Sequence, residues 1–425
     1  MIDFTATLDP EAGLVRGSEL RSPQGTDVPL WQGLVTLAWE EDPDADADRT
    51  ITPEVVGACG VARSDVLVRA AGEAVERFAL RPARADRGFS PRPDAERLDH
   101  RAPEVALGGA DLDDRRLTWY PARRLTDGAD LQVAAGLVDY PADEQQADGF
   151  DPSPSGAASG DGRDMALRSA LLEVVERDAV LVAWARRLAL PRVDLDESLR
   201  HAPATPAWRR LARALKLARD SGVEPVLAQV PTGIPGVVCA VGVVLDRYEG
   251  HPLAAVGCNA SADWGKSLAG ALQEAMQIRT VLQLTRRVQG DVATPEVVTG
   301  DIERALYFSA EAGAGAAQRW CAGFTDAVPV WEAGDVPVTV EHLVHHLDRQ
   351  GARPVAVDLS HRLPAGLREM GWAAVKVIPA GLQPLRMDER TDFGWNLPRL
   401  ASAESRTGLA AHAHLGSVPA PHPLI

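Results

Sequence analysis

Three short stretches of this 425-residue chain carry acidic and basic side chains at helical spacing. The first two share the pattern Glu-x-x-Glu-Arg, at Glu73–Arg77 and Glu173–Arg177, and the third is the variant Glu274–Arg279, EAMQIR. On a helix, positions i, i+3 and i+4 share one face, so each copy presents acidic and basic groups together. Carboxylate oxygens suit Mg²⁺ and guanidinium groups suit phosphate. The three copies therefore predict a nucleotide site that has neither a Walker loop nor a dinucleotide-binding turn.

The alternative for a single copy is a plain surface ion pair. A Glu–Arg pair at i, i+4 supports an exposed helix by roughly 0.2–0.5 kcal/mol and needs no ligand. Three copies, each interrupting a helix rich in Ala, Leu and Val, favour acidic pairs that face a polar cavity. Clustered carboxylates without a counterion repel one another and raise each other's pKa. If the three faces converge, a metal ion or an arginine must lie close to them.

Composition limits the class of protein. Hydrophobic residues make up 45% of the chain and charged residues 24%, which is typical of a soluble globular protein with a sizeable core. The formal net charge of −16 argues against a nucleic-acid binder, because such proteins concentrate Lys and Arg on one face. There is no signal-peptide pattern, and the uncharged run 225–245 is broken by Pro and Gly, which favours two buried strands over a membrane span. We expect a cytoplasmic protein.

Cysteine and histidine spacing predicts neither a zinc site nor a disulfide framework. The four cysteines show no C-x-x-C spacing. His342 and His346 have i, i+4 spacing but lack the glutamate of an H-E-x-x-H motif, which favours structural or surface histidines. No Ser or Cys carries a nucleophile signature such as G-x-S-x-G.

Apolar periodicity predicts helices interleaved with strands, so the expected fold class is α+β with mixed and antiparallel sheets packed against helices. Ser64 is expected to cap the first signature helix. Small-residue loops are expected to lead into the second and third signature helices, at 151–162 and 257–265, and an acidic loop is expected at 40–48. The expected helices are 64–80, a helix ending near 187, 206–221, 267–287 and 340–350, and the expected strands lie within 117–140, 225–245, 354–358 and 373–378.

The stretch Ser155–Ala179, SGAASGDGRDMALRSALLEVVERDA, resembles the hallmark of the YcaO family. That hallmark is a small-residue loop entering a helix that ends in Glu-x-x-Glu-Arg-Asp-Ala. Two further segments, Gly57–Arg77 and Gly257–Arg279, are similar to the family's first and third ATP-binding stretches. VIPAGLQPL, at Val377–Leu385, resembles a characteristic strand and turn. The similarities follow the family order over about 57–425.

The resemblance implies an enzyme that uses ATP and Mg²⁺ to activate a peptide-backbone amide. In azoline-forming members a Cys, Ser or Thr side chain attacks the preceding carbonyl, ATP phosphorylates the oxyanion, and phosphate leaves to give a thiazoline or oxazoline. The residues implied to hold Mg²⁺ are Glu73, Glu76, Glu173, Glu176, Glu274 and Gln277. Those implied to contact the nucleotide are Arg77, Gly156, Ala157, Ser159, Gly160, Arg177 and Arg279.

The sequence departs from the family pattern in one place. Where the family usually has Gly-Lys-Gly, this chain has Ala58-Cys59-Gly60. Cys59 cannot replace the charge of a lysine, so either Arg63 or Lys266 compensates or ATP affinity is weakened.

The last residues alternate with proline, which favours an extended polyproline-like segment. By itself such a tail would be a stiff appendage or a ligand for a proline-binding domain. Azoline-forming members commonly end in Pro-x-Pro-x-Pro placed in the active site, so the resemblance implies a catalytic tail, with the Ile425 carboxylate or His422 as the base. The tail residues concerned are Pro419, Pro421, His422, Pro423 and Ile425.

The expected organisation is an N-terminal segment 1–50 integral to the domain, a YcaO catalytic domain 51–405 and an extended tail 406–425. The leading hypothesis is an azoline-forming cyclodehydratase that acts on a ribosomally made precursor peptide. The alternatives are a macroamidine- or thioamide-forming relative and a non-catalytic ATP- or peptide-binding subunit. About 55 residues precede the first motif, too few for a leader-peptide-binding domain, so a separate partner protein or independent action is expected. A homodimer is a further expectation.

Overall fold

The computed structural model describes residues 2–24, 28–39, 54–82, 95–109, 117–290, 293–331, 334, 336–417 and 419–425. The predicted acidic loop at 40–48 lies outside these ranges. The chain separates into two compact units, and the predicted catalytic span 51–405 contributes to both. Unit 1 comprises Met1–Pro23, Trp31–Val174 and Leu343–Gly381, and unit 2 comprises Gln24–Leu30, Val175–His342 and Leu382–Ile425.

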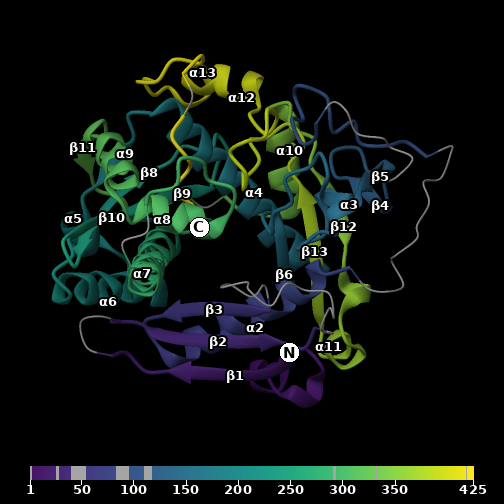
Figure 1. Cartoon of the computed structure of the whole chain (residues 1–425), viewed down its shortest axis with the longest axis horizontal. Coiled ribbons are helices and arrows are strands. Elements are labelled where there is room, and N and C mark those ends of the chain that lie inside the picture. Colours follow the sequence, from purple (N-terminus) through teal and green to yellow (C-terminus); the bar gives the residue numbers. More distant parts are fainter. Residues whose placement is uncertain are drawn as a thin grey trace. The chain divides into compact units, whose positions relative to one another are not determined.

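Unit 1 contains two antiparallel sheets and a helix, α2 (Arg63–Leu80), that packs on both (Figure 1). Its buried face is lined by Val66, Ala70, Ala74 and Val75, whose helical spacing and small size let both sheets approach the helix. The first sheet has the order β1-β2-β3, which are Val15–Arg21, Trp31–Leu37 and Val55–Gly60. The second has the order β5-β4-β12-β13-β6, which are Asp130–Ala134, Trp119–Arg124, Val355–Asp358, Trp372–Ile378 and Ala157–Asp161.

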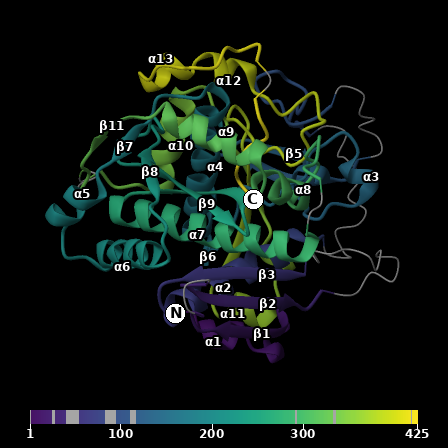
Figure 2. The same cartoon turned by 60° about the vertical axis from the view of Figure 1, so that its left-hand side comes forward.

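Unit 2 is built on one five-stranded sheet with the order β10-β9-β8-β7-β11. Helix α7 (Trp264–Gln289) packs on β9 and β10, and α6 (Pro206–Asp220) packs beside α7 (Figure 2). The strands β9 and β10 pair along their full length, and positive φ angles at Glu249 and Gly250 close the two-residue turn between them. The strands are His251–Ser261, Val238–Tyr248, Val226–Gln229, Pro191–Val193 and Thr325–Val328, in sheet order.

The remaining elements complete the two units. In unit 1 these are α1 (Phe4–Thr7), α3 (Glu144–Ala147), α11 (Ala365–Glu369) and three short 3₁₀ turns, Pro10–Ala12, Ala135–Leu137 and Ser360–Arg362. In unit 2 they are α5 (Leu195–His201), α8 (Asp301–Phe308), α9 (Glu311–Ala322), α12 (Leu397–Ala401) and α13 (Ala403–Thr407). Helix α4 (Arg163–Arg186) begins in unit 1 and ends in unit 2, and α10 (Val340–Arg349) begins in unit 2 and ends in unit 1.

The predicted α+β class is confirmed, but two local predictions are wrong. Helix α2 is capped by Ala62 without a side-chain bond, and Ser64 lies in its first turn beside Asp65, whose negative charge suits a helix start. Only part of each small-residue stretch predicted as a loop is a loop, because 157–161 forms β6 and 257–261 forms the end of β10. Small residues are needed there because a Cβ on Gly160 would lie 2.6 Å from the Ala166 amide nitrogen.

Two structural findings bear on the predictions about membrane spans and cysteines. Within the described ranges, no helix is long and apolar enough to cross a membrane. The four cysteines, Cys59, Cys239, Cys258 and Cys321, are free thiols and all are buried.

Candidate functional site

Each of the three signatures lies on a helix that directly follows a strand, as the pairs β3–α2, β6–α4 and β10–α7. In every pair the first glutamate of the signature, Glu73, Glu173 or Glu274, is the eleventh residue of its helix. At about 1.5 Å per residue, each of these glutamates stands about 15 Å along its helix from the first residue. The three signatures therefore share a position along their helices as well as a residue pattern.

The first group of site residues, here called the unit 1 cluster, consists of Glu73, Glu76, Arg77, Glu173 and Lys376. Arg77 Nε donates to Glu73 Oε1 at 2.9 Å and lies 3.9 Å from Glu76 Oε1. Burial raises the pKa of Glu76 well above its ordinary value, and the neighbouring Glu73 and Glu173 carboxylates raise it further. Burial and the two neighbouring carboxylates thus both disfavour a negative charge on Glu76.

Lys376, on β13, is a member of this cluster that the sequence predictions missed. Its side chain is buried, and Nζ donates to the carbonyl oxygens of Ser153 at 2.7 Å and Ser155 at 2.5 Å. Burial lowers the pKa of Lys376 to about 8, although Glu173 and Glu76 act in the opposite direction. The ammonium group therefore holds the segment that leads into β6. The only available signal was a lysine, one of three in the chain, inside an apolar strand.

The predicted nucleotide contacts at 156–160 are in contact with protein on several sides. Gly156 has φ +83°, and a Cβ there would lie 2.3 Å from the carbonyl oxygen of Val377. Ala157 is buried, and Ser159 Oγ donates to the carbonyl oxygen of Gly72 at 2.8 Å. The small side chains of this stretch are thus required by the packing of β6 in unit 1.

A second group, here called the unit 2 cluster, gathers Glu176, Arg177, Cys258, Ala260 and Glu274. Glu176 Oε2 accepts a hydrogen bond from the Ala260 amide at 2.6 Å, and Glu274 Oε2 accepts one from the Cys258 amide at 2.5 Å. Arg177 Nη2 lies 3.8 Å from Glu176 Oε1 and 4.0 Å from Glu274 Oε1. The structure therefore brings the second and third signatures together at the end of β10.

Cys258 lies in the middle of the unit 2 cluster and was not among the predicted site residues. Its Sγ is 3.3 Å from Glu176 Oε1 and 3.4 Å from Arg177 Nη1. Burial, followed by the charges of Glu176 and Glu274, raises the pKa of this thiol well above its ordinary value. The thiol is therefore protonated and donates to Glu176.

Two predicted site residues of the third signature, Arg279 and Gln277, are not members of either cluster. Arg279 is buried, and its Nε donates to Asp246 Oδ2 at 2.6 Å, so its guanidinium is engaged with β9. Gln277 is half-buried on α7. Of the three predicted phosphate-binding arginines, Arg77 and Arg177 lie among signature carboxylates, whereas Arg279 pairs with an acidic residue outside the signatures.

The predicted catalytic tail is packed into unit 2 near its end. Arg304, which is fully buried, donates from Nη1 to the carbonyl oxygen of His422 at 2.9 Å. His422 Nε2 donates to the carbonyl oxygen of Arg386, and Nδ1 accepts from the Leu424 amide at 3.3 Å. Burial, reinforced by the charge of Arg304, lowers the pKa of His422 well below its ordinary value. Both ring nitrogens are thus engaged. The other predicted tail residues are half-buried (Pro419, Pro421, Ile425) or buried (Pro423).

The side chains of the three signatures carry the kind of donor atoms that bind Mg²⁺. Carboxylate and amide oxygens are the ligands this ion prefers, and the unit 1 cluster places the carboxylates of Glu73 and Glu173 near that of Glu76. As the described side chains lie, no three His, Cys, Asp or Glu residues converge on one point. Arg77 and the backbone amides of Cys258 and Ala260 hold the carboxylates instead.

Comparison with known proteins defines the class. Residues 59–383 match the family model described as YcaO cyclodehydratase, ATP- and Mg²⁺-binding. The chain therefore belongs to the YcaO family, and the predicted cofactors, ATP and Mg²⁺, agree with that description. An uncharacterised protein of Methanothermobacter thermautotrophicus is 30% identical over 226 residues. That match covers 52% of this chain and 56% of the relative, so little more than half of the relative's length is spanned.

Solved structures share the fold. The YcaO of Methanopyrus kandleri bound with AMPPCP and Mg²⁺ has a TM-score of 0.56 at 19% identity, covering 88% of this chain and 87% of that one. A heterocyclase in complex with substrate and cofactor has a TM-score of 0.65 at 16% identity, covering 99% of this chain and 56% of that one. The Escherichia coli microcin synthetase McbBCD complex gives 0.59 at 12% identity, covering 85% and 87%. The predicted resemblance is confirmed.

Proposed function

We propose that this chain is an ATP-dependent cyclodehydratase that converts Cys, Ser or Thr residues of a ribosomally made peptide into thiazoline or oxazoline rings. The observation that supports this most is the course of α4. The helix carries Glu173, which acts on Glu76 in the unit 1 cluster, and Glu176, which is held by the Ala260 amide in the unit 2 cluster. Two carboxylates three residues apart on one helix face are a fixed pair of oxygen donors.

The proposed Mg²⁺ ligands are the oxygen donors of the three signatures, Glu73, Glu76, Glu173, Glu176, Glu274 and Gln277. When bound, ATP supplies a phosphoryl group that turns the amide oxygen of the substrate into a good leaving group. Arg77 and Arg177 would balance phosphate charge, which is the main contribution a protein makes to phosphoryl transfer. Arg77 must then release Glu73, to which it is bonded at 2.9 Å.

Other residues of the signatures are proposed to position this machinery. The bonds from Lys376 to the carbonyls of Ser153 and Ser155 support a role in holding the segment before Gly156. The ion pair between buried Arg279 and half-buried Asp246 supports a role for Arg279 in fixing α7 to β9, in preference to a role in binding phosphate. Both ring nitrogens of His422 are hydrogen-bonded, which supports a role for this residue in anchoring the proline-rich tail in preference to a role as the catalytic base.

A second candidate is a non-catalytic subunit that binds ATP or peptide within a modification complex. The observation that favours it is Cys59, a buried neutral thiol where the family usually has a lysine. The fold shared with the McbBCD complex supports the further proposal that a separate partner protein takes part.

The proposed activity is tested by incubating the purified chain, with any partner protein encoded beside it, with Mg²⁺, ATP and a Cys/Ser/Thr-rich candidate peptide. The expected result is loss of the mass of one water per ring, together with release of ADP and phosphate. Glu176→Gln should abolish both, while Glu369→Gln, an exposed carboxylate on α11, should leave both unchanged. Ring formation that persists in Glu176→Gln would reject the enzyme proposal. ATP binding without turnover in the wild type would favour the second candidate.

A further inference from the structure

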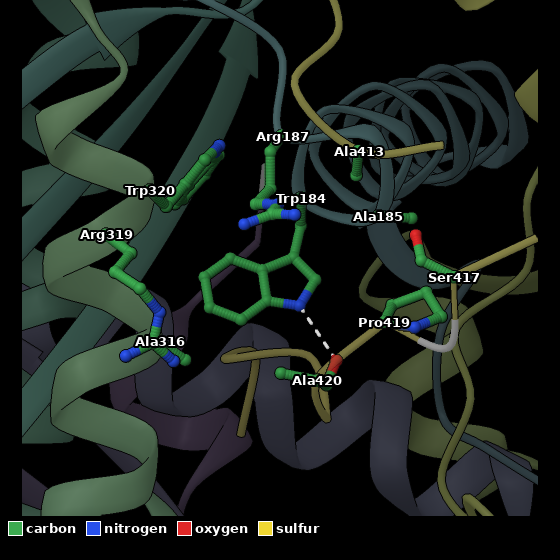
Figure 3. Close-up of a pocket in the computed structure, with 10 residues that line it drawn as sticks. All are labelled: Trp184, Ala185, Arg187, Ala316, Arg319, Trp320, Ala413, Ser417, Pro419 and Ala420. Carbon is green, nitrogen blue, oxygen red and sulfur yellow. Dashed lines mark hydrogen bonds between the residues drawn. The ribbon is translucent and has the colours of Figure 1, made fainter. Parts of the chain in front are cut away.

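Unit 2 contains a cavity of about 340 Å³ whose lining includes none of the cluster residues described above. Its walls come from the end of α4, from α9 and from the segment that leads into the proline-rich tail (Figure 3). Ligand pockets usually measure roughly 300–1,000 Å³, so this cavity is large enough for one side chain and its neighbours. The mechanism proposed above gives it no task.

Two indole rings form the apolar part of this cavity. The Trp184 and Trp320 ring centroids lie 5.1 Å apart at an interplanar angle of 83°, and the two residues are only 4% and 1% exposed. Trp184 Nε1 donates to the carbonyl oxygen of Ala420 at 3.0 Å, which fixes the orientation of this ring in the cavity wall (Figure 3). Trp320 Nε1 has no hydrogen-bond partner among the described residues. A rigid aromatic surface suits a flat apolar group.

Two guanidinium groups form the polar part. Arg187 and Arg319 are exposed and both line the cavity, and Figure 3 shows the Arg187 guanidinium beside the Trp184 indole. No carboxylate among the described residues pairs with either of them. In a chain of net charge −16, most of the surface repels anions, so two uncompensated arginines at one cavity create a local preference for a negative group.

The backbone conformation of Arg187 is a second observation that supports a functional role for its guanidinium. Helix α4 ends in a motif in which Leu188 N donates to the Ala183 carbonyl at 2.9 Å and Arg187 N to the Trp184 carbonyl at 3.1 Å. The residue at this position takes a left-handed conformation that glycine adopts without strain, yet here it is an arginine with φ +48°. Strained backbone of this kind concentrates at functional sites.

We propose that this cavity, here called the Trp184 pocket, binds an aromatic side chain and an adjacent carboxylate of the peptide that the enzyme modifies. The ring would lie against the indole surface that lines the cavity, and the carboxylate would pair with Arg187 and Arg319. Trp184 follows Glu176 by eight residues on α4, which is about 12 Å along the helix. An extended peptide covers that length in about four residues. The pocket therefore selects peptides with an aromatic–acidic pair about four residues from the modified position.

This inference rests on the proposed function for its choice of a peptide, and binding tests it without any turnover. Three fluorescently labelled hexapeptides of otherwise identical sequence would contain Phe-Asp, Phe-Asn or Ala-Asp at the centre. Fluorescence anisotropy on the full chain, without ATP or Mg²⁺, should give a Kd at least tenfold lower for Phe-Asp than for the other two. Equal affinity for all three peptides would overturn the proposal.

Variants separate the pocket from general effects of charge. Arg187→Gly removes the guanidinium and relieves the left-handed strain, so it should weaken Phe-Asp binding about tenfold while the Tm stays level or rises. Arg319→Gln should weaken binding similarly, and Arg213→Gln, which removes an exposed arginine from α6, should not. Undiminished binding in both Arg187→Gly and Arg319→Gln would refute the pocket.

One more variant keeps the two proposals apart. Glu176→Gln should bind the Phe-Asp peptide as the wild type does, since its side chain lies outside the pocket. If the peptide binds selectively but no ring ever forms with ATP, the proposed activity is wrong and the pocket stands. If rings form but Phe-Asp gives no preference, the pocket is wrong and the activity stands.

Discussion

Asp178 and Arg399 form a two-point ion pair inside unit 2. Arg399 Nη2 lies 2.6 Å from Asp178 Oδ2 and Nε lies 2.9 Å from Oδ1, with the two side chains 4% and 5% exposed. Asp178 Oδ1 also accepts the Gln383 amide at 2.9 Å. The aspartate of the Glu-x-x-Glu-Arg-Asp-Ala hallmark thus fastens α4 to α12 and to the start of the segment after β13, and it takes no part in either cluster.

We expect Asp178→Asn to lower the free energy of unfolding of unit 2 by about 3–5 kcal/mol, because it leaves a buried guanidinium without its counter-charge. The control is Asp196→Asn, which breaks the exposed pair with Arg219 at 3.0 Å and should cost at most about 1 kcal/mol. Urea denaturation followed by tryptophan fluorescence measures both. Similar losses in the two variants would contradict the role given to Asp178.

Glu76→Gln should make the metal-free protein more stable and less able to bind its cofactors. At pH 7.5 the expected gain in unfolding free energy is about 1 kcal/mol, because burial and two neighbouring carboxylates disfavour the charged form of Glu76. Calorimetry should show Mg²⁺-ATP binding weakened at least tenfold. Glu369→Gln is the matched exposed control. If Glu76→Gln destabilises the protein in EDTA, the carboxylate is better compensated than the structure indicates.

His422 should make stability depend on pH in the acidic range. Its pKa in the folded protein is lowered well below the ordinary value of 6.5, so below about pH 6.5 the unfolded chain takes up a proton that the folded chain does not. The free energy of unfolding therefore falls as the pH drops from about 6.5 to 5. His422→Gln should flatten this slope, whereas the exposed His414→Gln should leave it as in the wild type. An unchanged slope in His422→Gln would mean that the imidazole is not held neutral.

Lys376→Met should loosen the segment before β6. Two carbonyl oxygens, of Ser153 and Ser155, lose the ammonium group that they share, and buried acceptors without a donor are costly. Hydrogen exchange of the amides at 153–157 should become about tenfold faster. Lys216→Met, on the surface of α6, serves as the control. Unaltered exchange in this segment would argue against the positioning role of Lys376.

Cys59→Lys tests the departure from the family pattern. Cys59 is 8% exposed on β3, and burial raises the pKa of its thiol to about 11, so a charged side chain there must be desolvated. We expect the lysine variant to lose several kcal/mol of stability without a gain in ATP affinity. Cys59→Ala should keep wild-type ATP affinity. A stable Cys59→Lys variant with tighter ATP binding would show instead that the position faces the nucleotide.

The long amphipathic helices and the apolar strand pairs were predictable, because the spacing of apolar residues within each segment indicates which face is buried. The helix near 206–221 is α6 and the pair within 225–245 became β8 and β9, with ends shifted by a few residues. The strand β6 was predicted as a loop, because Gly, Ala and Ser favour no strand and its pairing with β13 spans about two hundred residues of sequence. Helices α8 and α9 were not predicted at all.

The candidate site also has a part that could be predicted from the sequence and a part that could not. The signature carboxylates share a helix face with their arginines, so their grouping on each helix is a local property. The choice of partner is not local: Arg279 pairs with Asp246, and Lys376 reaches Ser155, only because separate elements pack together. The sequence placed Asp178 in the hallmark pattern, but it did not identify the partner, Arg399, which lies more than two hundred residues further along the chain.

The equal position of the three signature glutamates along their helices has a consequence for how this chain can vary. A residue inserted between a helix start and its glutamate would advance the carboxylate by about 1.5 Å and turn it by about 100° around the helix, away from its cluster. Replacing the intervening residues changes neither value. The number of intervening residues therefore fixes where the carboxylate stands, and α2, α4 and α7 share that number although their sequences share little beyond the signature.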